Sequence, residues 1–378
     1  MLLWSESIAN VFKRLLETAI MALLLFSLSL GLSGAWWNSS STPKRESSMP
    51  PGNAITDPKS LLRYALPVEN QEIREIQNGL EDISEQLRGR RWGPMQSDLR
   101  RASLLLTTRE SDLLESIPEA KIPQGQDLIA TVLTGIDSLK EAVEAQDRAR
   151  ILQEQKQVLE KVGDLEELMV QDFPFEVPSE YDNLPQLKGR ATVEVVTSKG
   201  PVTVVVDGYS APVTAGNFVD LVERGFYDGL PFVRSEDNYV LQAGDPPGPE
   251  VGFVDPDTDE YRNIPLEILV RGDEEPIYGI TLEDLGLYRE QPILPFSAYG
   301  TLALARPEED PDGGSSQFFF FLFEAELTPA GLNLLDGRYT VFGYAIEGQE
   351  VLRQIKRGDK IESAKVIEGI ENLVLPQV

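Results

Sequence analysis

The sequence has neither cysteine nor histidine among its 378 residues. The chain therefore lacks thiol nucleophiles, Ser-His pairs and the usual protein ligands for zinc, copper and haem iron. Carboxylates alone can still hold calcium or magnesium, but no segment alternates Asp or Asn ligands around a central Gly and a closing Glu. We therefore expect no metal site and no cofactor, and any catalysis has to proceed without thiol or imidazole groups.

Positive charge is also scarce. The chain has 34 Lys and Arg residues against 62 Asp and Glu residues, which gives a formal net charge of -28. This surplus of carboxylates repels phosphate backbones and anionic lipid head groups, so nucleic acid is not an expected partner. The length is about twice the commonest size of a single domain, and we therefore expect two folded domains behind a leader.

The apolar run near the start of the chain, residues 20–32, is about 13 residues long, short of the roughly 20 that span a bilayer. Two basic residues precede it, and the small residues Ser33 and Ala35 stand just before Trp36. This order is typical of a secretory signal peptide. We predict that residues 1–35 are a cleaved signal peptide rather than a permanent anchor, and that the protein is exported.

Residues 36–57 are rich in Ser, Pro and Gly, and we interpret them as a flexible linker. Over residues 58–172, apolar residues recur at steps of three and four, which places them on one side of a helix. The four stripes are Ile73, Ile76, Leu80, Ile83 and Leu87; Leu99, Ala102, Leu106 and Leu113; Ile129, Val132, Ile136, Leu139 and Val143; and Ile151, Val158, Val162, Leu165 and Met169. One-sided helices bury their stripes against each other, so we expect a helical bundle over 58–172. A coiled-coil dimer is the alternative, although no stripe keeps its period for three to four heptads.

The junction between the third and fourth stripes has no Gly or Pro from Ala145 to Arg150. A single helix over residues 126–171 would be roughly 69 Å long at 1.5 Å per residue, which is too long for its neighbours to cover. We therefore predict a break or kink near Asp147.

The pattern changes after the fourth stripe. A linker over residues 173–190 contains Pro174, Pro178 and Pro185, and β-branched runs then flank the hairpin signal at 199–201. Apart from one helix-like stretch, residues 214–224, short strands alternate with Gly- and Pro-rich turns. This pattern predicts a closed antiparallel β-barrel over residues 191–378.

Five ordered segments of this region resemble the cyclophilins, and they are 211–218 (APVTAGNF), 232–234 (FVR) with 242–245 (QAGD), 300–305 (GTLALA), 316–319 (SQFF) and 335–343 (LDGRYTVFG). Each segment alone is a weak signal, but five in order are a strong one. The resemblance implies a barrel of cyclophilin type, with an insertion over residues 246–297. The helical region and the insertion are similar to those of the multidomain cyclophilins of the thylakoid lumen in cyanobacteria and chloroplasts. That group is associated with the assembly of photosystem II.

The resemblance implies peptidyl-prolyl cis-trans isomerase activity. Rotation about an Xaa-Pro bond costs about 20 kcal/mol because the C–N bond loses its partial double-bond character. At the twisted transition state the proline nitrogen regains a lone pair, so a fixed cationic donor stabilises that state more than the planar one. The resemblance assigns this donor to Arg234 and makes Gln242 the residue that holds its guanidinium. It also implies a substrate-binding pocket formed by Tyr239, Val240, Ala305, Arg306, Gln317, Phe319, Leu334, Leu335 and Tyr339.

Several pocket positions depart from the family pattern: Tyr239 replaces a phenylalanine, Val240 a frequent methionine, Arg306 an asparagine, Leu334 a tryptophan and Tyr339 a histidine. Loss of an aromatic wall lowers the affinity for proline by about 1 to 2 kcal/mol, roughly five- to thirtyfold. Three functions therefore stay open. The chain is an isomerase and folding factor, a non-catalytic chaperone or assembly scaffold that uses the pocket or the bundle only for binding, or a structural subunit of a membrane complex.

The expected partners are proline-containing polypeptides and, from the resemblance, photosystem II subunits at the thylakoid membrane. The expected location is the thylakoid lumen or the periplasm. The short, Pro-containing linker favours a fixed intramolecular contact between the helical bundle and the barrel. The insertion carries Ile264, Ile268, Ile277 and Ile280, which need burial. Either it packs partly against the bundle and narrows access to the catalytic arginine, or it folds over its own barrel.

Overall fold

The computed structural model describes residues 55–256, 258–322 and 333–376. The predicted signal peptide, residues 1–35, and nearly all of the predicted linker, residues 36–57, lie outside these ranges. Within the described residues, no helix combines the length and the apolar character that a membrane span requires.

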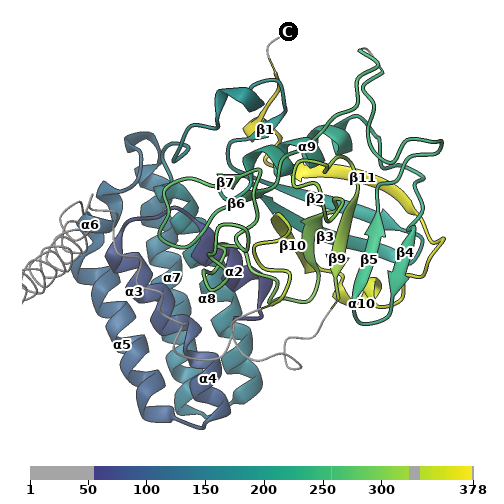
Figure 1. The fold of residues 1–378 in the computed structure, drawn as a ribbon. Helices are drawn as coiled ribbons and strands as arrows, with labels where there is room; N and C mark the ends of the chain where they lie inside the picture. Colours follow the sequence, from purple (N-terminus) through teal and green to yellow (C-terminus); the bar gives the residue numbers. More distant parts are fainter. Residues whose placement is uncertain (1–54, 257, 323–332, 377–378) are drawn as a thin grey trace, which may run out of the picture. The chain divides into compact units, whose positions relative to one another are not determined.

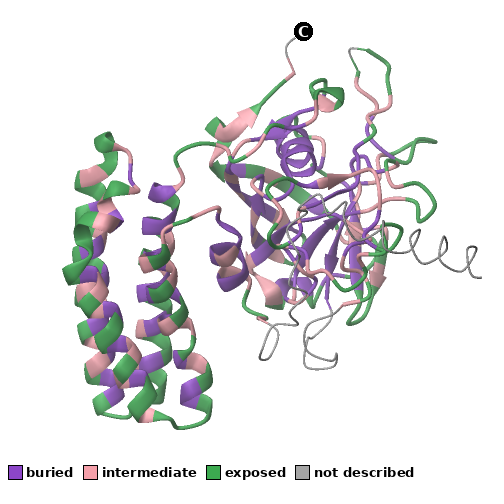
Figure 2. Ribbon diagram, turned by 60° about the vertical axis from the view of Figure 1, so that its left-hand side comes forward, coloured by how far each residue is buried: buried purple, intermediate pink, exposed green. Residues whose placement is uncertain are grey.

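The helical bundle is made of helices whose apolar sides face one another. Among the described residues these are α3 (Gln71–Glu81), α4 (Ile83–Arg88), α5 (Trp92–Thr108), α6 (Glu110–Glu115), α7 (Ile122–Glu144) and α8 (Arg148–Met169), with a 3-10 turn at Glu119–Lys121. All four predicted stripes are buried in one apolar cluster, while the opposite sides of the helices are exposed (Figure 2). The predicted bundle core is confirmed.

The predicted break between the last two stripes is confirmed as well. Helix α7 ends at Glu144 and α8 begins at Arg148, and Gln146 between them has a φ of 53°. The carboxylate of Asp147 accepts a hydrogen bond from the backbone N–H of Arg150 at 3.1 Å and so caps the second helix. A polar cap therefore separates two helices where neither Gly nor Pro marks the boundary.

The first two stripes are less regular than predicted, because each one crosses a helix boundary. Asp82 separates α3 from α4, and Arg109 separates α5 from α6. The apolar spacing continues across both boundaries, so the periodicity alone does not reveal them.

Helix α2 (Pro58–Ala65) has no counterpart in the sequence analysis. Asp57 caps it by accepting a hydrogen bond from the backbone N–H of Ser60 at 2.7 Å. Its buried residues Leu61, Leu62 and Ala65 do not join the core of the bundle. They belong to an apolar cluster on the sheet, together with Phe319 and other residues of strands. Helix α2 therefore provides the predicted contact between the helical part of the chain and the sheet.

The second half of the chain folds around an eight-stranded antiparallel sheet (Figure 1). Its strands are β2 (Arg190–Thr197), β3 (Gly200–Asp207), β4 (Arg234–Glu236), β5 (Val240–Ala243), β8 (Thr301–Leu304), β9 (Phe318–Phe321), β10 (Val341–Glu347) and β11 (Ile361–Glu368). The predicted helix after the first hairpin is α9 (Pro212–Glu223), and α10 (Gln349–Leu352) follows β10. Two small pairs complete the strands, β1 (Gln186–Leu187) with β12 (Leu373–Val374) and β6 (Glu267–Ile268) with β7 (Ile277–Tyr278).

The closed barrel predicted from the sequence is not seen among the described strands. They pair in the order β11-β2-β3-β10-β8-β9-β5-β4, which leaves β11 and β4 as the two ends. Outside the strands, one antiparallel bridge joins Pro231, just before β4, to Lys360, just before β11. Four backbone hydrogen bonds surround this bridge and join residues 229–232 to residues 358–361. The sheet is therefore curled, and its ends meet outside the strands rather than through a pair of β4 with β11.

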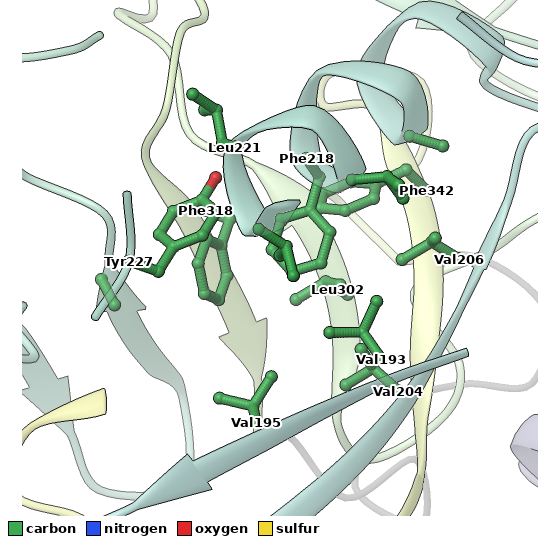
Figure 3. Packing of buried hydrophobic residues seen from close by; sticks show 14 of the residues in the cluster. Val193, Val195, Val204, Val206, Phe218, Leu221, Tyr227, Leu302, Phe318 and Phe342 are labelled. Atoms are coloured by element: carbon green, nitrogen blue, oxygen red, sulfur yellow. The ribbon is translucent and has the colours of Figure 1, made fainter. Parts of the chain in front are cut away.

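The core of the sheet is an aromatic and β-branched cluster against which α9 packs (Figure 3). Phe218 extends from this helix toward the strands and meets Phe318 edge to face, with ring centroids 5.2 Å apart. Val193 and Val204, which face each other on β2 and β3, lie beneath it. The alternating apolar residues of the first hairpin therefore form the floor of this core.

The insertion, residues 246–297, distributes its apolar side chains over three clusters. Ile264 belongs to the main sheet core, and Ile268 and Ile277 belong to a small cluster within the insertion. Near the end of the insertion, Phe296 shares a cluster with α2. The insertion therefore folds mainly over its own sheet and approaches the helical part through α2. That it narrows access to the catalytic arginine stays a prediction.

Candidate active site

The predicted catalytic arginine lies on the edge strand of the sheet. Arg234 is paired with Gln242 of the neighbouring β5, as the antiparallel register requires. Its side chain is 49% exposed, and its Nε donates a hydrogen bond to Glu236 Oε1 at 2.7 Å. Residues i and i+2 of a strand share one face, so Glu236 lies on the same side of β4 as the guanidinium. The sequence analysis missed Glu236, although this spacing carries the signal.

Gln242, which we predicted to hold the guanidinium of Arg234, forms its side-chain hydrogen bond with Gln317 instead. The amide nitrogen of Gln242 donates to Gln317 Oε1 at 2.7 Å. The amide nitrogen of Gln317 in turn donates to Asp245 Oδ1 at 2.9 Å and to the carbonyl of Val251 at 2.7 Å. Gln242 is therefore held in a chain of side chains that runs away from Arg234, while Glu236 takes the role of partner to the arginine.

Beside Arg234 lies a cavity of about 120 Å³. Most of the predicted site residues line it, together with Phe321, which the sequence analysis did not include. The lining residues are Arg234, Tyr239, Val240, Gln242, Ala305, Arg306, Phe319, Phe321, Leu335 and Tyr339. Gln317 and Leu334 are predicted site residues that do not line it.

Aromatic rings form the walls of this cavity. Phe319 and Tyr339 meet edge to face, with ring centroids 5.6 Å apart and planes at 90°. Phe296 of the insertion stacks on Phe319 at 6.0 Å. On the side of β4, Tyr239 contacts Phe321 at 5.9 Å. Leu334 is 86% exposed and does not line the cavity. That an aromatic wall is lost at this position stays a prediction.

The segment that carries Leu335 and Tyr339 is anchored by a buried carboxylate. Asp336 accepts hydrogen bonds from the backbone N–H of Phe296 at 2.8 Å and of Asn333 at 3.1 Å. Burial raises the pKa of Asp336 to about 6, and these two hydrogen bonds act against that rise. The anchor ties one wall of the cavity to the end of the insertion.

The chemistry that this arrangement supports is donation from a cationic side chain into a small cavity with aromatic walls. The cavity has one edge formed by a guanidinium and walls formed by aromatic and aliphatic side chains, which suits a ring such as that of proline. In the described part of the chain, no three carboxylates gather closely enough to hold a metal ion. Two guanidinium groups, those of Arg234 and Arg306, line the cavity together with the aromatic and aliphatic side chains.

Comparisons with known proteins identify both halves of the chain. Residues 57–170 match the family model of the PsbQ-like domain of CYP38-like peptidyl-prolyl cis-trans isomerases, and residues 192–372 match that of cyclophilin-type peptidyl-prolyl cis-trans isomerases. A putative thylakoid lumen peptidyl-prolyl cis-trans isomerase of Synechocystis is 56% identical over 96% of this chain and 96% of its own length. The chloroplastic isomerase CYP38 of Arabidopsis thaliana is 47% identical over 86% of this chain and 77% of its own length. The chloroplastic CYP37 of the same plant is 35% identical over 83% of this chain and 70% of its own length.

Proposed function

The chain belongs to the cyclophilin-type peptidyl-prolyl cis-trans isomerases, and we propose that it serves in the thylakoid lumen as an isomerase and assembly factor for photosystem II proteins. The observation that carries the catalytic part is the position of Arg234 at the edge of an aromatic cavity. The location is supported by the names of the relatives and by the predicted signal peptide.

In the proposed mechanism, the cavity takes up the proline ring and Arg234 acts on the amide bond that precedes it. Glu236 holds the guanidinium by its Nε. The two terminal amino groups then point to no partner among the described residues, and one of them donates to the proline nitrogen as that nitrogen becomes pyramidal. Because this lone pair exists only in the twisted state, the hydrogen bond lowers the barrier rather than strengthening ground-state binding.

A second candidate function is that of a non-catalytic chaperone which uses the pocket only to bind proline-containing segments. The exposed Leu334 favours it, since a cavity with one wall fewer holds the ring less firmly. Both candidates share the same site and the same clients, and they differ in whether bound peptide is isomerised.

The two candidates are separated by one assay on the mature chain, residues 36–378. We expect it to accelerate the cis-to-trans conversion of a short Xaa-Pro peptide and the proline-limited refolding of a model protein, both of which are slow without catalysis. Peptide binding without acceleration would establish the non-catalytic function. The link to photosystem II is tested separately, by binding of the mature chain to isolated photosystem II complexes, with an unrelated acidic protein as control.

The contact through α2 supports a further part of the proposal, that the helical region affects the pocket. Leu61 and Leu62 of α2 share one apolar cluster with the pocket residues Phe319 and Tyr339. A domain that is tethered acts at high effective concentration, so this contact persists even if it is weak. Polar substitutions at Leu61 and Leu62 are expected to change the affinity for peptide, and unchanged affinity would reject the coupling.

A further inference from the structure

The wall of the cavity formed by Tyr339 lies between two contacts. Phe319 contacts the ring edge to face, and the guanidinium of Arg306 lies 5.1 Å from its centroid. We propose that Arg306 is a positioning residue that fixes Tyr339 as a wall of the proline pocket and so sets the affinity for peptide. This inference rests on the proposed function of the pocket.

The hydrogen bonds of Arg306 join two separate loops. Its Nε and Nη2 both donate to the carbonyl of Arg338, at 3.0 and 2.6 Å. Its Nη1 donates to the carbonyls of Pro307 at 2.7 Å, Glu308 at 3.0 Å and Asp310 at 3.4 Å. One planar side chain therefore links the loop after β8 to the residue directly before Tyr339.

The acceptors show what this arginine does. Glu308 and Asp310 carry carboxylates close by, yet Arg306 uses their backbone carbonyls rather than their side chains. In a surface ion pair, the guanidinium would instead donate to the carboxylates. The guanidinium thus acts as a rigid fork. Lysine, with one compact ammonium group, cannot reproduce two N–H groups that converge on one carbonyl oxygen together with a flat contact with a ring.

The other anchors of this segment do not reach the tyrosine ring. Asp336 fixes the segment at Asn333 and at the insertion, and the Thr340 carbonyl accepts a hydrogen bond from the backbone N–H of Leu304. Between these points, Phe319 and Arg306 contact the Tyr339 ring, which also packs against the apolar cluster that contains Leu294. Because Leu334 points into solvent, its side chain supports no wall, and Arg306 compensates by holding the ring that remains.

A wall of the pocket contacts the proline ring equally in the planar and the twisted state. Loss of its position therefore weakens ground-state and transition-state binding alike, which raises KM and leaves kcat unchanged. We expect Arg306→Lys to raise KM for a short Xaa-Pro peptide five- to tenfold, with kcat within twofold of the unsubstituted chain. Arg306→Ala is expected to have at least the same effect.

Arg338→Lys is the matched control. Its side chain is 43% exposed and pairs with Glu283, and only its backbone carbonyl takes part in the link, so KM is expected to stay within twofold. A double-mutant cycle completes the test. If Arg306 acts through the ring, then Tyr339→Leu raises KM as well. The KM of the double variant is then no higher than that of the single variant with the higher KM.

The results that overturn the proposal are equally definite. An unchanged KM in Arg306→Lys, or effects of Arg306→Lys and Tyr339→Leu that add, shows that Arg306 does not act through Tyr339. Peptide dissociation constants measured by calorimetry separate this outcome from failure of the proposed function. If the full mature chain binds peptide without isomerising it, catalysis fails while the dissociation constants still test the role of Arg306. A mature chain that binds no peptide overturns both.

Discussion

The N-terminus of α9 is capped by a carboxylate from the insertion, and this produces a defined dependence of stability on pH. The helix has Ala211 at its N-cap position, which offers no side-chain acceptor. Glu267 of β6 fills that role from 54 residues along the chain: its carboxylate accepts from the backbone N–H of Thr214 at 2.5 Å and of Val213 at 3.3 Å. Its side chain is 1% exposed, and burial raises the pKa of Glu267 to about 7, against the hydrogen bonds that lower it.

The sign of the effect follows from proton uptake. The folded state binds a proton that the unfolded state, with a pKa near 4.5, has already released, so folding is favoured most at low pH. The stability due to this group falls as pH rises from about 4.5 to about 7 and is constant above that. With 1.36 kcal/mol for each pH unit, the ionised carboxylate costs roughly 3 kcal/mol at pH 8.

Glu267→Gln removes the ionisation and keeps an oxygen for the N–H of Thr214. Its NH2 group then faces the N–H of Val213, which costs about 1 kcal/mol for one lost hydrogen bond. We therefore expect the variant to be more stable than the unsubstituted chain by roughly 2 kcal/mol at pH 8 and about equally stable at pH 5, where ionisation of Glu267 already costs about 1 kcal/mol.

Hydrogen exchange of the α9 backbone amides, corrected for the intrinsic pH dependence, measures this locally in a chain with more than one folded part. Glu362→Gln, an exposed carboxylate on β11, is the control and is expected to change protection little at either pH. Equal destabilisation by Glu267→Gln at both pH values would refute the reasoning, because it would show that ionisation of the buried carboxylate does not destabilise the fold.

Three further predictions concern the site and the core. Glu236→Gln keeps an acceptor for Arg234 Nε but removes the opposing charge, so kcat/KM is expected to rise about two- to fivefold. The control is Asp237→Asn, which is expected to leave kcat/KM unchanged because the Asp237 carboxylate pairs with Lys356. A fall in activity in steady-state assays would show that the negative charge itself assists. Leu334→Trp is expected to lower the dissociation constant for peptide by about fivefold, since it adds an aromatic wall; calorimetry that finds no change would place this position away from the bound ring. Phe218→Ala removes the ring that joins α9 to the sheet and is expected to cost about 3 to 5 kcal/mol in chemical denaturation, whereas a loss below about 1 kcal/mol would contradict its place in the core.

The sequence predicts those features that depend on local spacing or on ordered segments. The bundle core follows from its stripes, and the turn at Asp147 follows from the length that a single helix would have. Helix α2 was missed because eight residues with three buried apolar side chains repeat too briefly to give a stripe. The curled sheet was predicted as a closed barrel because strand patterns do not show where pairing stops.

The candidate site divides in the same way. The position of Arg234 opposite Gln242 follows from the segments, since the hairpin between them fixes the register. Their hydrogen bonds do not follow, because Glu236 competes for the guanidinium from the same strand face, and Gln317, the residue before β9, competes for the amide of Gln242. The link made by Arg306 was also beyond prediction, since the carbonyl of Arg338 lies 32 residues away.

The central claim is that Arg234 catalyses the rotation of Xaa-Pro bonds in the cavity beside it. The most direct test compares isomerisation by the full mature chain, by Arg234→Ala and by Arg357→Ala, an exposed arginine outside the cavity. We expect Arg234→Ala to lose at least about a hundredfold in kcat/KM with unchanged thermal stability, as for removal of a transition-state donor, and Arg357→Ala to retain full activity. Activity of Arg234→Ala equal to that of the unsubstituted chain would contradict the account.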